Sequence, residues 1–285
     1  MNKPSAILCT ALLAVAQTAM AERQSYSYLG LEAAYYDYQE QLSSLALETD
    51  YSVLNPALQS GAYVNANERW GFYLTNSSNF IANGDNESFA IDGVEVQTNQ
   101  ATIRTTNTKF DLTYQLSENQ ALLLGVNVLT FDFNRSDFVI TEQGLALGIQ
   151  NPNGDQGRED FDIADAITEN HLSISTTLGY EVGNLFESNN RSRFSYQLQA
   201  MVGIPWYYRV TNSATSADKT LTSQFEGWEI YSRLSAGFKV TENIQLAATL
   251  TANYYQRDAI RSGNVTIPEV AIMEIKPGLA VFWSF

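Results

Sequence analysis

His171 is the one histidine of the 285-residue chain, and Ser173 follows two positions later. A histidine beside a serine can act as a general base, because the imidazole takes the hydroxyl proton and leaves the oxygen nucleophilic. Residues two apart in an extended strand point to the same face, so both side chains would lie on one side of a sheet. This pair is therefore the first candidate for chemistry that needs a nucleophile and a base.

Charged side chains of both signs recur among strand-like segments, where they share a face with small or polar neighbours. Such charges either pair and fill an interior or line a conduction path and set its selectivity, and the filled interior is our preferred interpretation. The charges of this inner face are Glu32, Lys109, Asp111, Glu229, Arg233, Lys239, Glu274 and Lys276.

Residues 151–162 are rich in oxygen ligands and glycine, which makes calcium a candidate ligand. Their spacing does not match an EF-hand loop. A solvated acidic loop explains the same composition, because charged surface loops need no ligand. Cys9 is the single cysteine and lies in a predicted leader, so disulfide and thiol chemistry are excluded from the mature chain. We therefore predict neither a metal site nor a cofactor.

The elements that must position these residues are strands, because apolar residues recur with a period of two. One apolar face and one small or polar face suit a wall between lipid and a lumen. At the C-terminus the apolar face consists of Pro277, Leu279, Val281, Trp283 and Phe285. This pattern resembles the closing-strand signature of bacterial outer-membrane proteins, which the assembly machinery reads. The resemblance implies an outer-membrane β-barrel.

The N-terminus predicts export. A basic start at residues 1–3, an apolar run at 6–15 and the small-x-small site at 19–21 indicate a secretory signal peptide over 1–21, followed by a barrel over 22–285. No stretch reaches the roughly 18 consecutive apolar residues of a membrane helix. The 31 acidic residues against 16 basic ones disfavour nucleic-acid binding. An acidic surface suits solubility in salt, divalent cations at the lipopolysaccharide layer, or cation preference in a pore.

About ten alternating segments follow the signal peptide, each long enough to cross a bilayer at a tilt. A wall in hydrocarbon must close, because an open edge leaves backbone groups unsatisfied. Twelve strands would result if residues 138–148 added a hairpin to the wall, and Ile91-Asp92-Gly93-Val94 predicts a two-residue hairpin. Short predicted periplasmic turns lie at 65–68, 117–120 and 241–243, and long extracellular loops near 39–50, 77–101, 134–170, 211–225 and 256–268.

Two enzyme resemblances bear on the barrel. The His171-Leu172-Ser173 spacing is similar to the H-x-S motif of outer-membrane phospholipases and lipid A deacylases, where the pair faces lipid and asparagine commonly follows the serine. Here Ile174 follows, and the alternation turns His171 and Ser173 toward the lumen. Omptin-like proteases resemble the chain only in architecture, because it has neither paired-Asp nor Asp-His motifs. No catalytic assignment follows, and His171 is read as a polar residue near the outer rim.

The sequence therefore predicts an all-β, closed antiparallel transmembrane barrel. A lumen of about ten strands is barely wider than its own side chains. We expect a non-enzymatic monomer whose extracellular loops serve an envelope, adhesion or receptor role. The alternatives are a narrow cation-preferring diffusion channel and a lipid hydrolase that uses His171 and Ser173. A solitary autotransporter-like barrel is related, but strand one begins too early for a passenger. Expected partners are membrane lipid, lipopolysaccharide and the barrel assembly machinery, and the extracellular ligand cannot be named.

Overall fold

The computed structural model describes residues 23–42, 46–148, 166–186, 192–213, 220–262 and 265–285. The predicted signal peptide with Cys9, and the candidate calcium loop 151–162, lie outside these residues. The elements are β1 (Tyr26–Leu42), β2 (Leu47–Asn65), β3 (Trp70–Asn79), β4 (Gly84–Ile91), β5 (Val94–Ser117), β6 (Gln120–Ile140), α2 (Glu142–Ala146), β7 (Ala166–Gly183), β8 (Phe194–Asn212), β9 (Thr220–Ser223), β10 (Trp228–Lys239), β11 (Ile244–Arg257), β12 (Ile260–Ser262), β13 (Val265–Ile267) and β14 (Glu269–Ser284).

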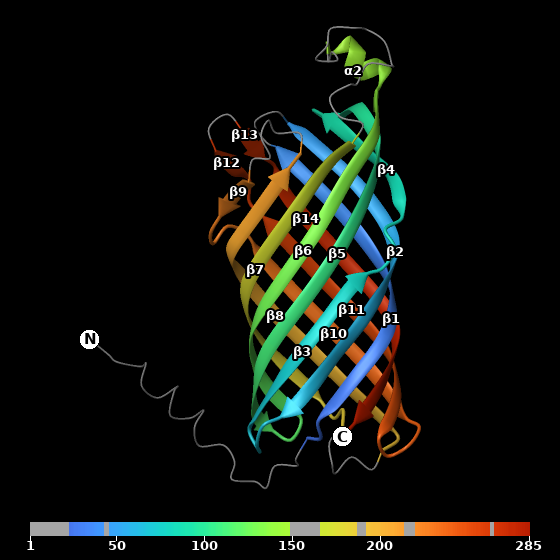
Figure 1. Ribbon diagram of the computed structural model, residues 1–285, viewed down its shortest axis with the longest axis vertical. Coiled ribbons are helices and arrows are strands. Elements are labelled where there is room, and N and C mark those ends of the chain that lie inside the picture. Colours follow the sequence, from blue (N-terminus) through green and yellow to red (C-terminus); the bar gives the residue numbers. More distant parts are fainter. Residues whose placement is uncertain (1–22, 43–45, 149–165, 187–191, 214–219, 263–264) are drawn as a thin grey trace, which may run out of the picture.

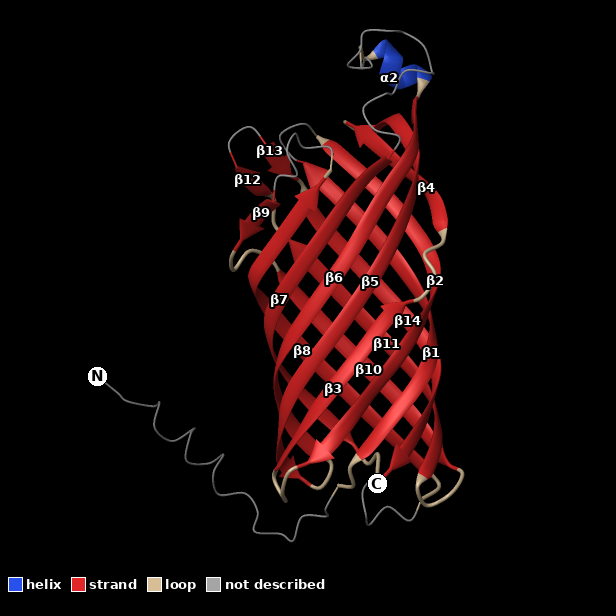
Figure 2. Ribbon diagram, in the orientation of Figure 1, coloured by secondary structure: helices blue, strands red, loops and turns tan. Residues whose placement is uncertain are grey.

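Ten of the described strands form a closed antiparallel ring (Figure 1). Their order is β1-β14-β11-β10-β8-β7-β6-β5-β3-β2, and β2 pairs back onto β1. The strands are steeply tilted, and the short turns from β2 to β3, β5 to β6 and β10 to β11 lie together at one end (Figure 2). We call this the periplasmic end and the opposite one the extracellular end. The ring confirms the predicted all-β barrel of about ten strands.

Side chains alternate between the outer and inner faces of the wall. On β1, Leu29 and Leu31 are 47% and 60% exposed, whereas Tyr28 and Glu32 are only 4% and 6% exposed. A period of two is the signature of a strand with two different environments. The alternation that the sequence predicts is therefore confirmed, with apolar residues outside and polar or aromatic residues inside.

The outer wall carries an apolar belt with aromatic residues at both rims. Trp70 and Trp283 are exposed near the periplasmic end, and Trp206 and Trp228 near the extracellular end. Such girdles mark the two interfaces of a membrane. Above the belt, the outward residues of β1 and β2 change from apolar to polar, for example from Leu54 to Asp50. The upper barrel therefore rises beyond the apolar belt.

The connections agree with most of the turn signals. Asp92 and Gly93 join β4 to β5 with positive φ angles of 51° and 74°, as a type I′ hairpin requires. The twelve-strand alternative is wrong, because residues 138–140 continue β6 and residues 142–146 form α2, which Thr141 caps. The predicted long loop at 77–101 is also wrong in part, since β4 and β5 occupy most of it.

Among the described residues, no helix is long and apolar enough to cross a bilayer.

One part of the wall is interrupted, which the sequence did not predict. β3 stops at Asn79, part-way up the wall, and β4 begins at Gly84 (Figure 2). The β2 pairing with β3 ends at Ala57, and the pairing with β4 occupies residues 47–50. We call the interval between residues 51–56 of β2 and residues 103–105 of β5 the β2–β5 gap.

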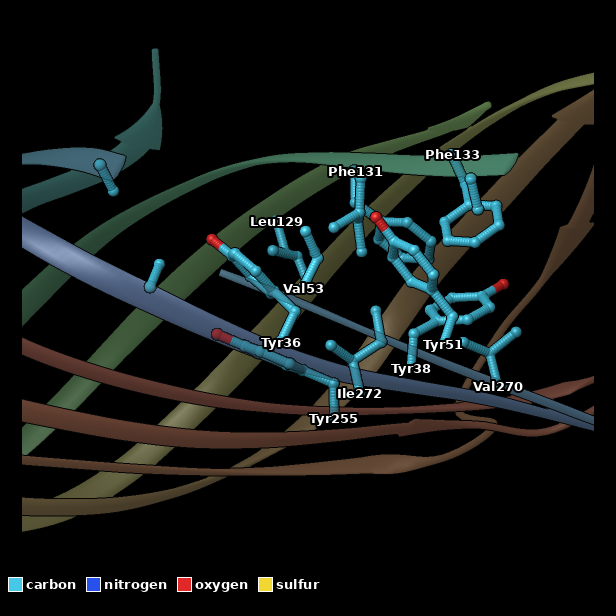
Figure 3. Close-up of a cluster of buried hydrophobic side chains, with 14 residues drawn as sticks. Tyr36, Tyr38, Tyr51, Val53, Leu129, Phe131, Phe133, Tyr255, Val270 and Ile272 are labelled. Atoms are coloured by element: carbon cyan, nitrogen blue, oxygen red, sulfur yellow. The ribbon is translucent and has the colours of Figure 1, made fainter. Parts of the chain in front are cut away.

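The core of the protein lies in the lumen. In the upper half, Tyr38 stacks on Phe133 with ring centroids 4.3 Å apart, and side chains from strands on opposite sides of the ring meet (Figure 3). In the lower half, Tyr28 stacks on Phe282 at 4.8 Å. The upper aromatic cluster consists of Ala34, Tyr36, Tyr38, Tyr51, Val53, Ala57, Ala101, Ile103, Leu129, Phe131, Phe133, Tyr255, Val270 and Ile272. The lower aromatic cluster consists of Tyr26, Tyr28, Tyr63, Tyr73, Leu123, Leu185, Phe186, Met201, Ala247, Ala280 and Phe282.

Candidate functional site

The structure places the predicted inner-face charges on the inside of the wall. Lys239 is half-buried at the periplasmic end of β10. The others are almost wholly buried, because strands on opposite sides of a narrow ring bring their side chains into contact across it. These are Glu32, Lys109, Asp111, Glu229, Arg233, Glu274 and Lys276.

Several of these charges pair in the middle of the lumen. Lys276 Nζ lies 2.9 Å from Glu274 Oε2, and Lys109 Nζ lies 3.7 Å from Asp111 Oδ2. Arg233 instead donates to the hydroxyl of Tyr28 and to Gln59 Oε1, the latter at 2.9 Å. These contacts cross the lumen from β10 to β1 and β2.

His171 and Ser173 share the inner face of β7, but their hydrogen bonds lead to other residues. His171 Nδ1 lies 2.7 Å from the hydroxyl of Tyr208, and Nε2 lies 3.2 Å from Glu169 Oε2. Ser173 Oγ accepts from Nη2 of Arg257 at 2.8 Å. A nucleophile needs a base within hydrogen-bond reach of its hydroxyl. In this arrangement the imidazole does not serve Ser173, and both side chains are buried.

The extracellular part of the lumen contains the upper charge cluster, which is Arg135 with the three carboxylates around it. Arg135 contacts Glu87 at 2.7 Å, Glu40 at 2.8 Å and Glu169 at 3.0 Å. Its guanidinium also stacks 4.4 Å from the ring centre of Phe133. The five donors of a planar guanidinium explain how one arginine serves three carboxylates from three strands.

The periplasmic part contains the lower charge cluster, in which Arg23 pairs with Glu181. Arg23 Nη1 also donates to the hydroxyl of Tyr73 at 2.9 Å. Glu181 Oε2 accepts from the amides of Gln197 and Gln199 at 3.0 and 2.8 Å. The carboxylate therefore has three donor residues from two parts of the chain, the segment before β1 and strand β8.

One cavity inside the barrel is small, and two recesses at its extracellular rim are larger. A cavity of about 20 Å³ between Glu32, Arg233 and Lys276 has room for about one water molecule. Two recesses of about 400 and 490 Å³ lie at the rim, and their linings contain no basic residue. The acidic residues that line them are Glu40, Glu48, Asp50, Glu87, Glu95 and Glu269.

No protein-family model matches the chain, and no curated protein sequence does either. Solved structures do match. The outer membrane protease OmpT from Escherichia coli superimposes with a TM-score of 0.67 at 8% identity, covering 94% of this chain and 99% of that one. The translocator domain of the autotransporter NalP from Neisseria meningitidis gives 0.41 at 8% identity, covering 98% and 95%. Ail of Yersinia pestis gives 0.33 at 8% identity, covering 91% and 99%.

The fold is that of a bacterial outer-membrane β-barrel. Its apolar belt and aromatic girdles belong to a wall in contact with lipid. The chain is therefore a protein of the bacterial outer membrane, as the sequence predicts. At 8% identity the likeness to OmpT concerns the fold alone.

In this barrel the residues that resemble an assembly signal lie along one strand. Leu279, Val281, Trp283 and Phe285 are exposed on the outer face of β14 or just after it, and Pro277 lies on the same face. Their role in assembly stays a prediction. Among the described residues, no group of three or more His, Cys, Asp or Glu side chains is arranged to hold a metal ion.

Several charged residues of the outer-membrane barrel were missing from the sequence prediction. The alternation of inward and outward side chains could have identified most of them, because they lie on the inward-facing positions of predicted strands. Glu40 follows Glu32 on the inner face of β1, and Arg257 follows Asn253 on the inner face of β11. No such signal existed for Arg23, which precedes β1. The missed residues are Arg23, Glu40, Glu87, Arg135, Glu169, Glu181 and Arg257.

Proposed function

We propose that this protein is a non-enzymatic, monomeric outer-membrane barrel that acts through its extracellular end. The observation that carries the proposal is the filled lumen. Charge clusters at both ends and paired charges in the middle occupy its cross-section. An axial path for hydrated ions needs continuous water-filled space, and side chains fill that space in a barrel of this size.

The hydrogen bonds of His171 and Ser173 support the absence of hydrolase chemistry. Arg257 donates to Ser173 Oγ, and a hydroxyl that accepts from a guanidinium is not thereby activated toward an ester. Tyr208 and Glu169 engage the two ring nitrogens of His171. This geometry suits structural roles for both residues.

The acidic extracellular rim supports a role in contacts outside the membrane. Its recesses are lined by carboxylates without basic residues, so the rim favours cationic groups of a partner. Loops held on a rigid scaffold are common binding elements. Lipopolysaccharide and its divalent cations are the neighbours that every such rim meets, and a specific extracellular partner would use the same surface.

Conductance in planar bilayers tests the closed lumen. We expect the mature chain from Glu22 to insert without steady single-channel steps at neutral pH. A variant carrying Glu274→Ala, Lys276→Ala and Tyr28→Ala removes the central contacts but leaves the charge clusters at both ends, so we expect it to stay silent as well. Heat-modifiable gel mobility of the protein recovered from the bilayer lipid verifies the folded barrel, and reproducible cation-selective steps from the unaltered protein would refute the closed lumen.

Esterase assays test the non-enzymatic assignment. We expect the detergent-folded protein to hydrolyse neither short-chain esters nor phospholipids, with or without calcium. An activity that Ser173→Ala abolishes and Ser195→Ala leaves intact would instead establish a serine hydrolase. Ser195 is a suitable control because it is a buried inner-wall serine on β8 that hydrogen-bonds Gln245.

A further inference from the structure

The upper charge cluster contains more carboxylates than cations. Arg135 contacts Glu40, Glu87 and Glu169, and all four side chains are buried. The other buried pairs of an arginine or lysine with a carboxylate, in the part of the chain that the structure describes, set one cation against one carboxylate. When like charges share a buried site, loss of the last proton is disfavoured. We therefore expect one of the three carboxyl groups to hold a proton.

The donors around the cluster single out Glu40. Glu87 accepts from Arg135 at both oxygens, Oε1 at 2.9 Å and Oε2 at 2.7 Å. Glu169 accepts from Arg135 at Oε1 at 3.0 Å, and its Oε2 lies 3.2 Å from an imidazole nitrogen. Within the described residues, the hydrogen bonds of the Glu40 carboxyl all involve Oε1, which contacts the Tyr38 hydroxyl and Arg135. Oε2 of Glu40 can therefore carry a proton without displacing a donor.

His171 extends the cluster but does not neutralise it. Its Nε2 faces Glu169 and its Nδ1 faces the hydroxyl of Tyr208. A neutral imidazole satisfies both contacts, because it donates from Nε2 and accepts at Nδ1. Burial lowers the pKa of His171, which favours the same neutral form. The positive charge that faces the three carboxylates is therefore that of Arg135.

One of the two rim recesses gives Glu40 access to the outside. Glu40 lines the recess of about 400 Å³. The other titratable side chains that line it are Glu48, Asp50, Tyr254 and Glu269. Gln39 and Gln41, the strand neighbours of Glu40, are polar and exposed, so this part of β1 lies above the apolar belt. A proton can therefore pass between bulk water and Glu40 without crossing lipid.

Titration of Glu40 affects stability with a definite sign. Burial raises the pKa of Glu40 to about 7, and the neighbouring carboxylates add to the rise while Arg135 opposes it. The unfolded chain has the ordinary glutamate pKa of 4.5, so the folded chain binds the proton more tightly. The stability that this proton contributes is complete below the unfolded pKa and is lost as the pH rises through the folded one.

We propose that the upper charge cluster is a pH-sensitive contact between opposite walls of the extracellular end, and that Glu40 carries the proton that controls it. β7 lies opposite β1 in the ring, so Arg135 and Glu169 meet Glu40 across the lumen. With the proton bound, two carboxylates face the guanidinium. When the proton leaves through the recess, a third charge repels the other two and weakens the contact. This response to external pH needs no ligand and goes beyond the proposed function.

Unfolding equilibria at two pH values test the contact. The mature chain from Glu22 is unfolded in urea at pH 6 and pH 8 and followed by tryptophan fluorescence. Loss of the Glu40 proton should raise the unfolding constant about tenfold over this interval. We therefore expect the ratio of the constants at pH 8 and pH 6 to be about tenfold larger in the unaltered protein than in Glu40→Gln. The titration of His171 is common to both proteins and cancels.

Glu48→Gln is the matched control, because it removes an exposed carboxylate from the same recess. It should keep the ratio of the unaltered protein. Equal ratios in the unaltered protein and Glu40→Gln would overturn the proposal.

Infrared difference spectra between pH 6 and pH 8 detect the proton directly. We expect the carbonyl stretch of a protonated carboxyl to disappear on raising the pH, in the unaltered protein and in Glu48→Gln but not in Glu40→Gln. Absence of this band from the unaltered protein would refute the bound proton, even if Glu40→Gln fails to fold. A band that persists in Glu40→Gln would refute its assignment to Glu40.

Discussion

The two ends of the lumen contain buried charge clusters that differ in the ratio of guanidinium groups to carboxylates. At the extracellular end one guanidinium, that of Arg135, faces three carboxylates, whereas at the periplasmic end Arg23 faces one. Glu181 also receives two glutamine amides, so its charge is shared among several donors. The comparison indicates that the extracellular cluster depends on a single residue, Arg135. The periplasmic cluster instead shares its contacts among several residues.

The largest effect should follow Arg135→Met. The substitution leaves three buried carboxylates without their common cation, and breaking a buried ion pair from one side costs about 3–5 kcal/mol. Urea unfolding followed by tryptophan fluorescence measures the loss. Arg135→Lys should recover only part of it, because an ammonium cannot make the forked contacts of a guanidinium. A smaller loss than that of the corresponding periplasmic variant would contradict the comparison.

Arg23→Met should have a smaller effect, about 2 kcal/mol, since Glu181 keeps the amides of Gln197 and Gln199 as donors. The same unfolding measurement applies. Adding Gln197→Leu and Gln199→Leu should bring the loss to the level of Arg135→Met. If the three changes together cost no more than the single one, the redundancy at this end is absent.

The smallest effect should follow Glu40→Gln. This change removes one of the three carboxylates around Arg135 and leaves two, so stability should stay within about 1 kcal/mol of the unaltered protein. Glu181→Gln is the matched change at the other end, and it should cost more because it leaves Arg23 without a carboxylate. Equal losses in the two variants would show that the excess of carboxylates has no energetic consequence.

The strands were predictable because their signal is local. Alternation along β8, from Phe194 to Trp206, gives both the strand and its outward face, and Asp92-Gly93 gives the hairpin. The interruption between β3 and β4 was not predictable from this signal, because residues 76–79 and 84–88 are mostly polar on both faces. Alternation cannot distinguish a continuous strand from a broken one where neither face is apolar.

The candidate site was predictable only as a set of inward positions. Period two assigns Glu229 and Arg233 to the inner face, but their partners depend on tilt and register across the ring. Glu229 pairs with Arg257, 28 residues away, and Glu40 meets Arg135, 95 residues away. The same limit applies to Ser173, whose neighbour in the fold is Arg257 of β11 and not the adjacent histidine of its own strand.

The pairing of β1 with β14 has a consequence for how the chain reaches its native state. Tyr26 lies beside Ser284 and Glu40 beside Val270, so the seam joins segments from opposite ends of the sequence. Contacts of such large sequence separation delay folding, because the entropy of closing the chain is lost before the contacts form. β14 is the last strand of the ring in the sequence, so the seam can form only after the other nine strands of the ring have been synthesised. Closure of the ring is therefore a late event in folding.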